Sequence, residues 1–172
     1  MEILNPVTED EVLECFVLAE RGSERYGETV RKLLKRVGDN PRAVLSAYRS
    51  WPDQGLFGGF PPDVRWYRAR LTRAEVLDIR YINWDWWLRI TDGTRRPPVA
   101  AARQKPDAGD ELIAGGAATN PELIAVRAPG SYLVLLEGHV RLTAYATFPE
   151  HLPDGLEIYF GESPSMARWC LY

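Results

Sequence analysis

The sequence has no long apolar run and few cysteines or histidines, and each shortage excludes a class of protein. None of its 172 residues form an apolar run long enough to cross a bilayer. The start of the chain also lacks the basic, apolar and small-residue order of a signal peptide. No Cys or His pair has metal-ligand spacing, which argues against a structural zinc site. We therefore expect a cytoplasmic protein that does not enter membranes, with Cys15 and Cys170 as buried thiols.

The sequence does contain enough apolar and aromatic residues for a substantial core. Apolar residues make up 45% of the chain, and six of them are Trp. This length fits one domain, or one small domain with a helical appendage.

Charge is distributed unevenly along the chain. The net charge is −3, which argues against strong binding of duplex DNA by bulk electrostatics. Residues 63–105 nevertheless carry ten Lys and Arg against five Asp and Glu, whereas residues 106–172 carry three against nine. The basic segment is either a solvated surface, which is the commoner case, or a surface that faces phosphate.

Residues 1–50 are predicted to form a small helical unit. A capping box at Thr8 and Glu11 begins the first helix, and Gly38 ends the second. Asn40 and Pro41 are typical of the N-cap and first residue of a third helix. If the chain binds a protein partner, these helices are where we expect the contact.

Residues 51–63 are a Pro- and Gly-rich connection, and the remainder, residues 64–172, has mixed α and β character. Thr72 and Glu75 form a second capping box, and three Trp residues follow within positions 84–87. We expect these Trp side chains to pack as a wall against the sheet, with a base-stacking platform as the alternative. Residues 104–120 are typical of a loop. Strands are expected near 123–127, 132–136 and 156–160, and a short final helix from Ser163.

The most informative segment is the one in which a buried strand runs directly into a helix. Leu133–Leu136 is apolar, Glu137 and Gly138 follow, and a helix begins at once. The first backbone N–H groups of a helix lack internal partners and lie at its positive end, so they favour an anion such as phosphate. Gly138 permits a close approach of the backbone, and Arg141 adds a bidentate cation. Glu137 can act on the ligand, or merely cap the helix start.

The segment Leu136–Ala144 resembles the signature of the ParB/sulfiredoxin superfamily, in which a strand runs into a Gly-x-x-Arg turn and a helix. Glu137-Gly138-His139-Val140-Arg141 is most similar to the free-serine kinases of that superfamily, which carry an acidic residue before Gly-His. The resemblance covers residues 64–172. It implies an α/β (α+β) domain with a ParB/sulfiredoxin-like mixed sheet and flanking helices, preceded here by the helical unit.

Two departures from the superfamily pattern bear on the chemistry. His139 occupies the position of the sulfiredoxin cysteine, so reduction of a sulfinic acid is not expected. Val140 replaces the first of the two ParB arginines, which argues against a ParB-like clamp, while Arg141 keeps the phosphate contact.

The first functional hypothesis is a nucleotide-using enzyme. It binds an ATP- or CTP-type nucleoside triphosphate with Mg²⁺, and transfers or hydrolyses the terminal phosphate. Gly138, His139, Val140 and Arg141 bind phosphate, Glu137 and His139 are catalytic, and Glu137 is a possible Mg²⁺ contact. Thr94 and Arg95, at an Asp-Gly turn, are further candidate phosphate donors, although a plain turn is the commoner explanation.

The second hypothesis is a non-catalytic ParB-like binding module. In this case the pocket holds a nucleotide or nothing, the helical unit contacts a protein partner, and the chain acts without turnover, for example as a regulatory component of a defence or toxin–antitoxin system.

Overall fold

The computed structural model describes residues 1–23, 26–52, 54–102 and 123–172. The described strands form one five-stranded mixed sheet in the order β1-β2-β5-β3-β4. Neighbouring strands are antiparallel except β3 and β5, which are parallel. The strands are β1 (Glu2–Val7), β2 (Arg65–Leu71), β3 (Ile124–Arg127), β4 (Val134–Glu137) and β5 (Leu156–Glu162). The predicted α/β class with a mixed sheet and flanking helices is therefore confirmed.

Three helices follow β1, and the predicted caps begin two of them. Thr8 and Glu11 form the capping box of the first, and the Asn40 side chain accepts from the backbone N–H of Ala43 at the start of the third. Gly38 ends the second with a φ of 75°. These helices are α1 (Glu9–Gly22), α2 (Gly27–Val37) and α3 (Pro41–Arg49).

The remaining helices are short and lie on the other side of the sheet. The capping box of Thr72 and Glu75 begins the first of them, as predicted. They are α4 (Arg73–Asp78), α5 (Asp85–Ile90), α6 (Pro97–Ala101) and α8 (His139–Thr147). Of the single turns of 3-10 helix, Pro149–His151 directly follows α8, whereas Gly55–Phe57 and Met166–Arg168 place Phe57 and Met166 in the core on the α1–α3 side.

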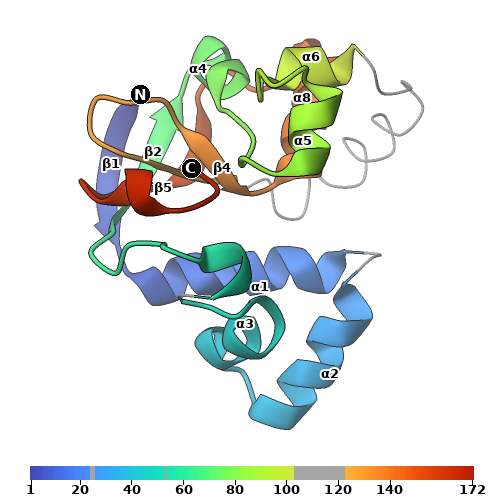
Figure 1. Cartoon of the computed structure of the whole chain (residues 1–172), viewed down its shortest axis with the longest axis vertical. Coiled ribbons are helices and arrows are strands. Elements are labelled where there is room, and N and C mark those ends of the chain that lie inside the picture. The colour runs from blue at the N-terminus through green and yellow to red at the C-terminus, as the bar shows by residue number, and fades with distance from the viewer. Residues whose placement is uncertain (24–25, 53, 103–122) are drawn as a thin grey trace.

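Two apolar cores, one on each face of the sheet, give the protein three layers. The alternation along β4 shows the arrangement, because Val134 and Leu136 belong to one core and Leu135 to the other. The first core joins the sheet to α1, α2 and α3, and the second joins it to α4, α6 and α8. Figure 1 shows α1–α3 gathered on one side and α4, α5, α6 and α8 on the other.

Four features differ from the expectations or lie beyond them. The segment before α1 forms the edge strand β1, which pairs with β2 and was not predicted. Trp84 and Trp86 are about half exposed, so the expected wall of packed Trp side chains is wrong for both. The final helix is one turn of 3-10 helix at Met166–Arg168. The loop predicted at 104–120 lies outside the described residues.

No helix among the described residues is long and apolar enough to cross a membrane.

Candidate functional site

The predicted strand–turn–helix is present at the end of β4. The strand ends at Glu137, Gly138 takes the left-handed conformation with φ 97° and ψ 25°, and α8 begins at His139. The buried side chains of Val134–Leu136 hold the strand in the sheet, and Leu142 makes the first α-helical bond of the new helix, to the carbonyl of Gly138 (2.8 Å). Gly138 offers no side-chain acceptor to the first turn. The start of α8 therefore has the polarity of an anion site.

Gly138 is required here for two reasons. Its positive φ disfavours any residue with a Cβ. A Cβ at this position would also lie 2.5 Å from Cδ2 of Leu123 and 3.5 Å from Nη1 of Arg141. The second distance places the Arg141 guanidinium directly beside the turn. The structure thus brings together Glu137, Gly138 and Arg141 as the sequence analysis expected.

The environment of Glu137 opposes its ionisation. Burial, followed by the negative charge of Glu20, raises the pKa of Glu137 to about 7. The charges of Arg141 and Arg49 and the backbone N–H of Gly138 act in the opposite direction, and are outweighed. At neutral pH this carboxyl group therefore exchanges a proton readily, as a general base or acid must.

Glu137, Arg141, Glu20 and Arg49 form a charge cluster, in which the charges of the other three act on Glu137. Glu20 and Arg49 belong to it although both come from the N-terminal helices. Glu20 is 5% exposed and forms an ion pair with Arg49. The Arg49 guanidinium lies over both Tyr26 and Tyr48, 4.5 Å from each ring centroid, and the two rings contact each other edge to face at 5.5 Å. Its charge acts on both Glu137 and His139. The helices α1 and α3 therefore contribute two charged side chains to the site at the end of β4.

The sequence analysis missed these two residues. One signal was present, because Glu20 lies four residues after Phe16 and so continues the buried side of α1 with a carboxylate. A charge on an apolar helix face needs a partner, but sequence alone does not show that the partner is Arg49.

His139 is held as a neutral ring in an aromatic stack. Its centroid lies 5.1 Å from that of Trp87 and 5.9 Å from that of Tyr81, with interplanar angles of 22° and 16°. Burial, followed by the charge of Arg49, lowers the pKa of His139 to about 3. Its Nε2 atom is buried and has no hydrogen-bond partner among the described residues. A ring that is neutral at pH 7 is poorly suited to the predicted role as a proton donor, and better suited to packing.

Val140 follows His139 on the first turn of α8 and is 60% exposed. Its side chain is therefore directed to solvent, and the contribution that the sequence predicts for it is its backbone N–H.

Thr94 and Arg95 make their hydrogen bonds to residues other than those of the Gly138–Arg141 turn. The Arg95 guanidinium donates to the carbonyl oxygens of Tyr81 (2.7 Å) and Tyr172 (2.8 Å), and Thr94 Oγ1 donates to the carbonyl of Thr91 (2.7 Å). Arg95 is 8% exposed. These contacts favour the plain-turn explanation, in which Arg95 ties Tyr81 to the C-terminal residue.

At least four of the eight arginines that the structure describes in the basic segment form ion pairs with carboxylates. Their carboxylate partners come mostly from the acidic last part of the chain. The pairs are Arg68 and Arg70 with Glu157, Arg73 with Asp154, and Arg96 with Asp78. This pairing favours a neutralised surface over one that faces phosphate, and weak binding of duplex DNA stays a prediction.

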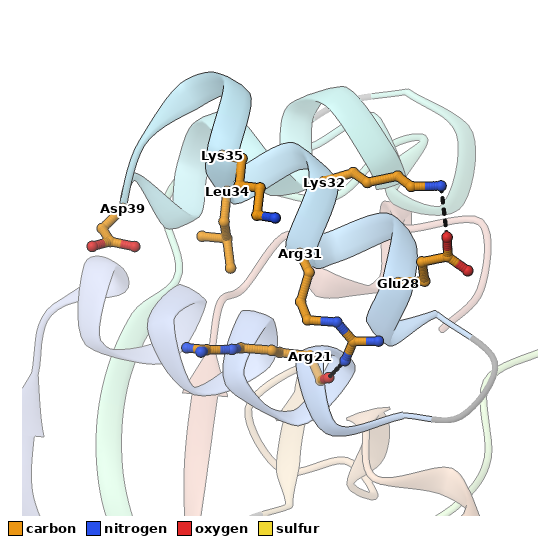
Figure 2. A pocket seen from close by; sticks show the side chains of 7 residues that line it. All are labelled: Arg21, Glu28, Arg31, Lys32, Leu34, Lys35 and Asp39. Carbon is orange, nitrogen blue, oxygen red and sulfur yellow. Dashed lines mark hydrogen bonds and ion pairs between the residues drawn. The ribbon is translucent and has the colours of Figure 1, made fainter.

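A separate hollow of about 500 Å³ lies between α1 and α2. Figure 2 shows Arg31 reaching back to the end of α1, where it donates to the carbonyl oxygen of Arg21 (3.2 Å), and Lys32 paired with Glu28 (2.7 Å). The lining residues are Arg21, Glu28, Arg31, Lys32, Leu34, Lys35 and Asp39. None of them belongs to the charge cluster, so this surface is distinct from the candidate site.

Neither a metal cluster nor a disulfide is formed by the described residues. They contain no group of three or more His, Cys, Asp or Glu side chains able to hold a metal ion. Neither cysteine forms a disulfide; Cys15 is buried as expected, whereas Cys170 is exposed. No family model, curated protein or solved structure matches the chain. The resemblance to the ParB/sulfiredoxin superfamily therefore depends on the residues of the turn alone.

Proposed function

We propose that this protein binds a nucleoside triphosphate of the ATP or CTP type at the Gly138–Arg141 turn, and that it transfers or hydrolyses the terminal phosphate with Mg²⁺. One observation carries the proposal: a carboxyl group with a pKa of about 7, a glycine in the left-handed conformation and an arginine share one strand–helix junction. The Glu137 carboxyl group can take up and release a proton at neutral pH. The turn at Gly138 and the Arg141 guanidinium can bind phosphate oxygens.

The phosphate contacts come from the backbone and from one guanidinium. The N–H groups of the first turn of α8 lie at the positive end of the helix and have no partners within it, so they favour a phosphate oxygen. Gly138 supplies the left-handed turn that begins the helix, and Leu123 fills the space that a Cβ there would take. Arg141, 3.5 Å from the position that a Gly138 Cβ would take, adds paired charged donors.

Glu137 is the proposed general base. An acceptor hydroxyl group, from water or a small alcohol, attacks the terminal phosphorus and gives its proton to the Glu137 carboxylate. The bond from that phosphorus to the bridging oxygen breaks, and the nucleoside diphosphate leaves with the electron pair. His139, neutral and stacked on Trp87, contributes at most a neutral hydrogen bond to phosphate.

The residues fit Mg²⁺ only as a partner of the nucleotide. Mg²⁺ in nucleotide sites is usually held by one or two carboxylates together with phosphate oxygens and water. As the alternative to its role as general base, Glu137 is the carboxylate that would contact the ion, since burial and the charge of Glu20 leave Glu137 short of positive charge. The ion would neutralise charge on the phosphate oxygens.

The test is turnover with each common nucleoside triphosphate and Mg²⁺, measured as release of diphosphate. Glu137→Gln is expected to lower kcat by about a hundredfold or more with nearly unchanged nucleotide affinity, because Gln keeps the shape but takes up no proton. Glu150→Gln, which changes an exposed carboxylate on another turn, is the control and is expected to leave kcat unchanged. Equal turnover in Glu137→Gln and the parent protein would remove Glu137 from the mechanism. Nucleotide binding without turnover in the parent protein would instead support the non-catalytic binding module.

A further inference from the structure

Helix α5 exposes two Trp side chains close to the candidate site. Trp84 is 51% exposed and Trp86 is 49% exposed, and both are among the few large apolar side chains so exposed in the described residues. Exposed Trp side chains are uncommon in a monomeric protein unless they meet a ligand or partner. What they meet depends on how α5 is placed.

An aromatic stack fixes α5 against the first turn of α8. The Trp87 ring lies 4.1 Å from that of Tyr81 and 5.1 Å from that of His139, with interplanar angles of 14° and 22°. Tyr81 is fully buried, and its hydroxyl group is 2.6 Å from Oγ1 of Thr143, which in turn donates to the carbonyl of His139 (2.9 Å). The side of α5 that carries Trp87 therefore lies directly beside the proposed phosphate site.

The two exposed Trp residues differ in their position on this helix. Trp84 is the N-cap of α5, in an extended conformation (φ −122°, ψ 139°), and directly precedes the first turn of the helix, which carries Trp87. The Arg89 guanidinium covers the ring of Trp86 at 4.8 Å. Among the described residues no aromatic ring or cation covers the Trp84 ring, so Trp84 is the exposed indole with an open face.

We propose that Trp84 stacks on the base of the nucleotide whose phosphates bind at Gly138–Arg141. This inference depends on the proposed function and adds to it a preference for nucleotides over inorganic polyphosphate. A flat indole ring binds any nucleobase through its face, so the preference is for a base in general and not for one base. Trp84 lies three residues before Trp87, whose ring stacks on His139, and this short separation in the chain links the base to the phosphate turn.

The experiment compares ATP, CTP, GTP, UTP and inorganic tripolyphosphate, each with Mg²⁺, by calorimetric titration of the parent protein and two matched variants. Trp84→Ala is expected to bind all four nucleotides about ten- to a hundredfold more weakly and tripolyphosphate unchanged. Trp86→Ala removes an equally exposed indole from the same helix and is expected to keep every affinity within about twofold of the parent. Trp84→Phe retains an aromatic face and is expected to recover most of the lost nucleotide affinity.

The outcomes separate this inference from the proposed function. Nucleotide affinities that are the same in Trp84→Ala and the parent protein, or larger losses in Trp86→Ala, overturn stacking on Trp84. A parent protein that binds tripolyphosphate as tightly as nucleotides also overturns it, while leaving the phosphate site intact. A parent protein that binds neither nucleotide nor tripolyphosphate overturns the proposed function itself, and the base site with it. Thermal unfolding of each variant shows whether a loss of affinity reflects a loss of folded protein.

Discussion

The carboxylate of Glu20, near the end of α1, acts on Glu137, at the end of β4: after burial, its negative charge is the next cause that raises the pKa of Glu137. The two side chains come from the segments that the sequence analysis treated as separate units, residues 1–50 and 64–172. Their electrostatic interaction means that the N-terminal helices shape the chemistry of the turn.

Glu137→Gln is expected to stabilise the protein increasingly as the pH rises. Because the pKa of Glu137 is about 7 in the folded state and near 4.5 in the unfolded chain, the folded protein retains a proton that the unfolded chain loses. The resulting stability is present below about pH 4.5 and is lost as the pH rises through 7. At pH 8 the variant should be more stable than the parent by about 1–3 kcal/mol.

The measurement is urea unfolding of both proteins from pH 5 to pH 8. His139 has the opposite dependence, since its lowered pKa adds stability as the pH rises toward 6.5, but it is present in both proteins and cancels in the difference. A stability difference that does not change with pH would contradict the raised pKa of Glu137.

Glu20 is expected to contribute to that pKa in addition to burial, while the charge of Arg49 opposes it. Glu20→Gln removes a negative charge and should lower the pKa of Glu137, as followed by NMR titration of its carboxyl carbon. Because it also leaves the Arg49 charge unpaired, the variant should lose about 3 kcal/mol of stability, the lower end for a buried pair since Arg49 is partly exposed. Glu9→Gln changes a more exposed ion-pair partner on α1 and serves as the control. An unchanged Glu137 titration in Glu20→Gln would show that the helices do not reach the site.

Gly138→Ala is expected to destabilise the protein more than Gly130→Ala does. Both positions have positive φ, 97° and 73°, but only the Cβ at 138 meets a neighbour, Cδ2 of Leu123 at 2.5 Å. The conformational cost is about 1–2 kcal/mol at each position, and the clash adds to it at 138. Adding Leu123→Ala should reduce the extra cost in a double-mutant cycle, measured by chemical unfolding. Equal losses at the two glycines would show that Leu123 yields without cost.

Much of the fold could be predicted from sequence because it depends on local signals. Features that depend on contacts between distant segments could not be predicted. Residues close together in the sequence determine the capping boxes at Thr8 and Thr72 and the turn at Gly138, and all three are present. The edge strand β1 was missed because its pairing with β2 is what makes it a strand. Arg49 was missed because its place in the site depends on packing of α3 against the sheet. The exposure of Trp84 was misjudged because composition favours burial of Trp and does not show which side of α5 faces solvent.

The most direct test of the central claim, that the turn binds phosphate, is calorimetric titration of the parent protein and Arg141→Ala with ATP, CTP and inorganic tripolyphosphate in the presence of Mg²⁺. Arg36→Ala, which removes an exposed arginine from α2, controls for the loss of one positive charge. We expect Arg141→Ala to weaken every one of these ligands about ten- to a hundredfold, the usual scale for a charge-assisted hydrogen bond, and Arg36→Ala to bind as the parent does. Equal affinity in Arg141→Ala and the parent protein, or no binding by the parent protein at all, would contradict the claim.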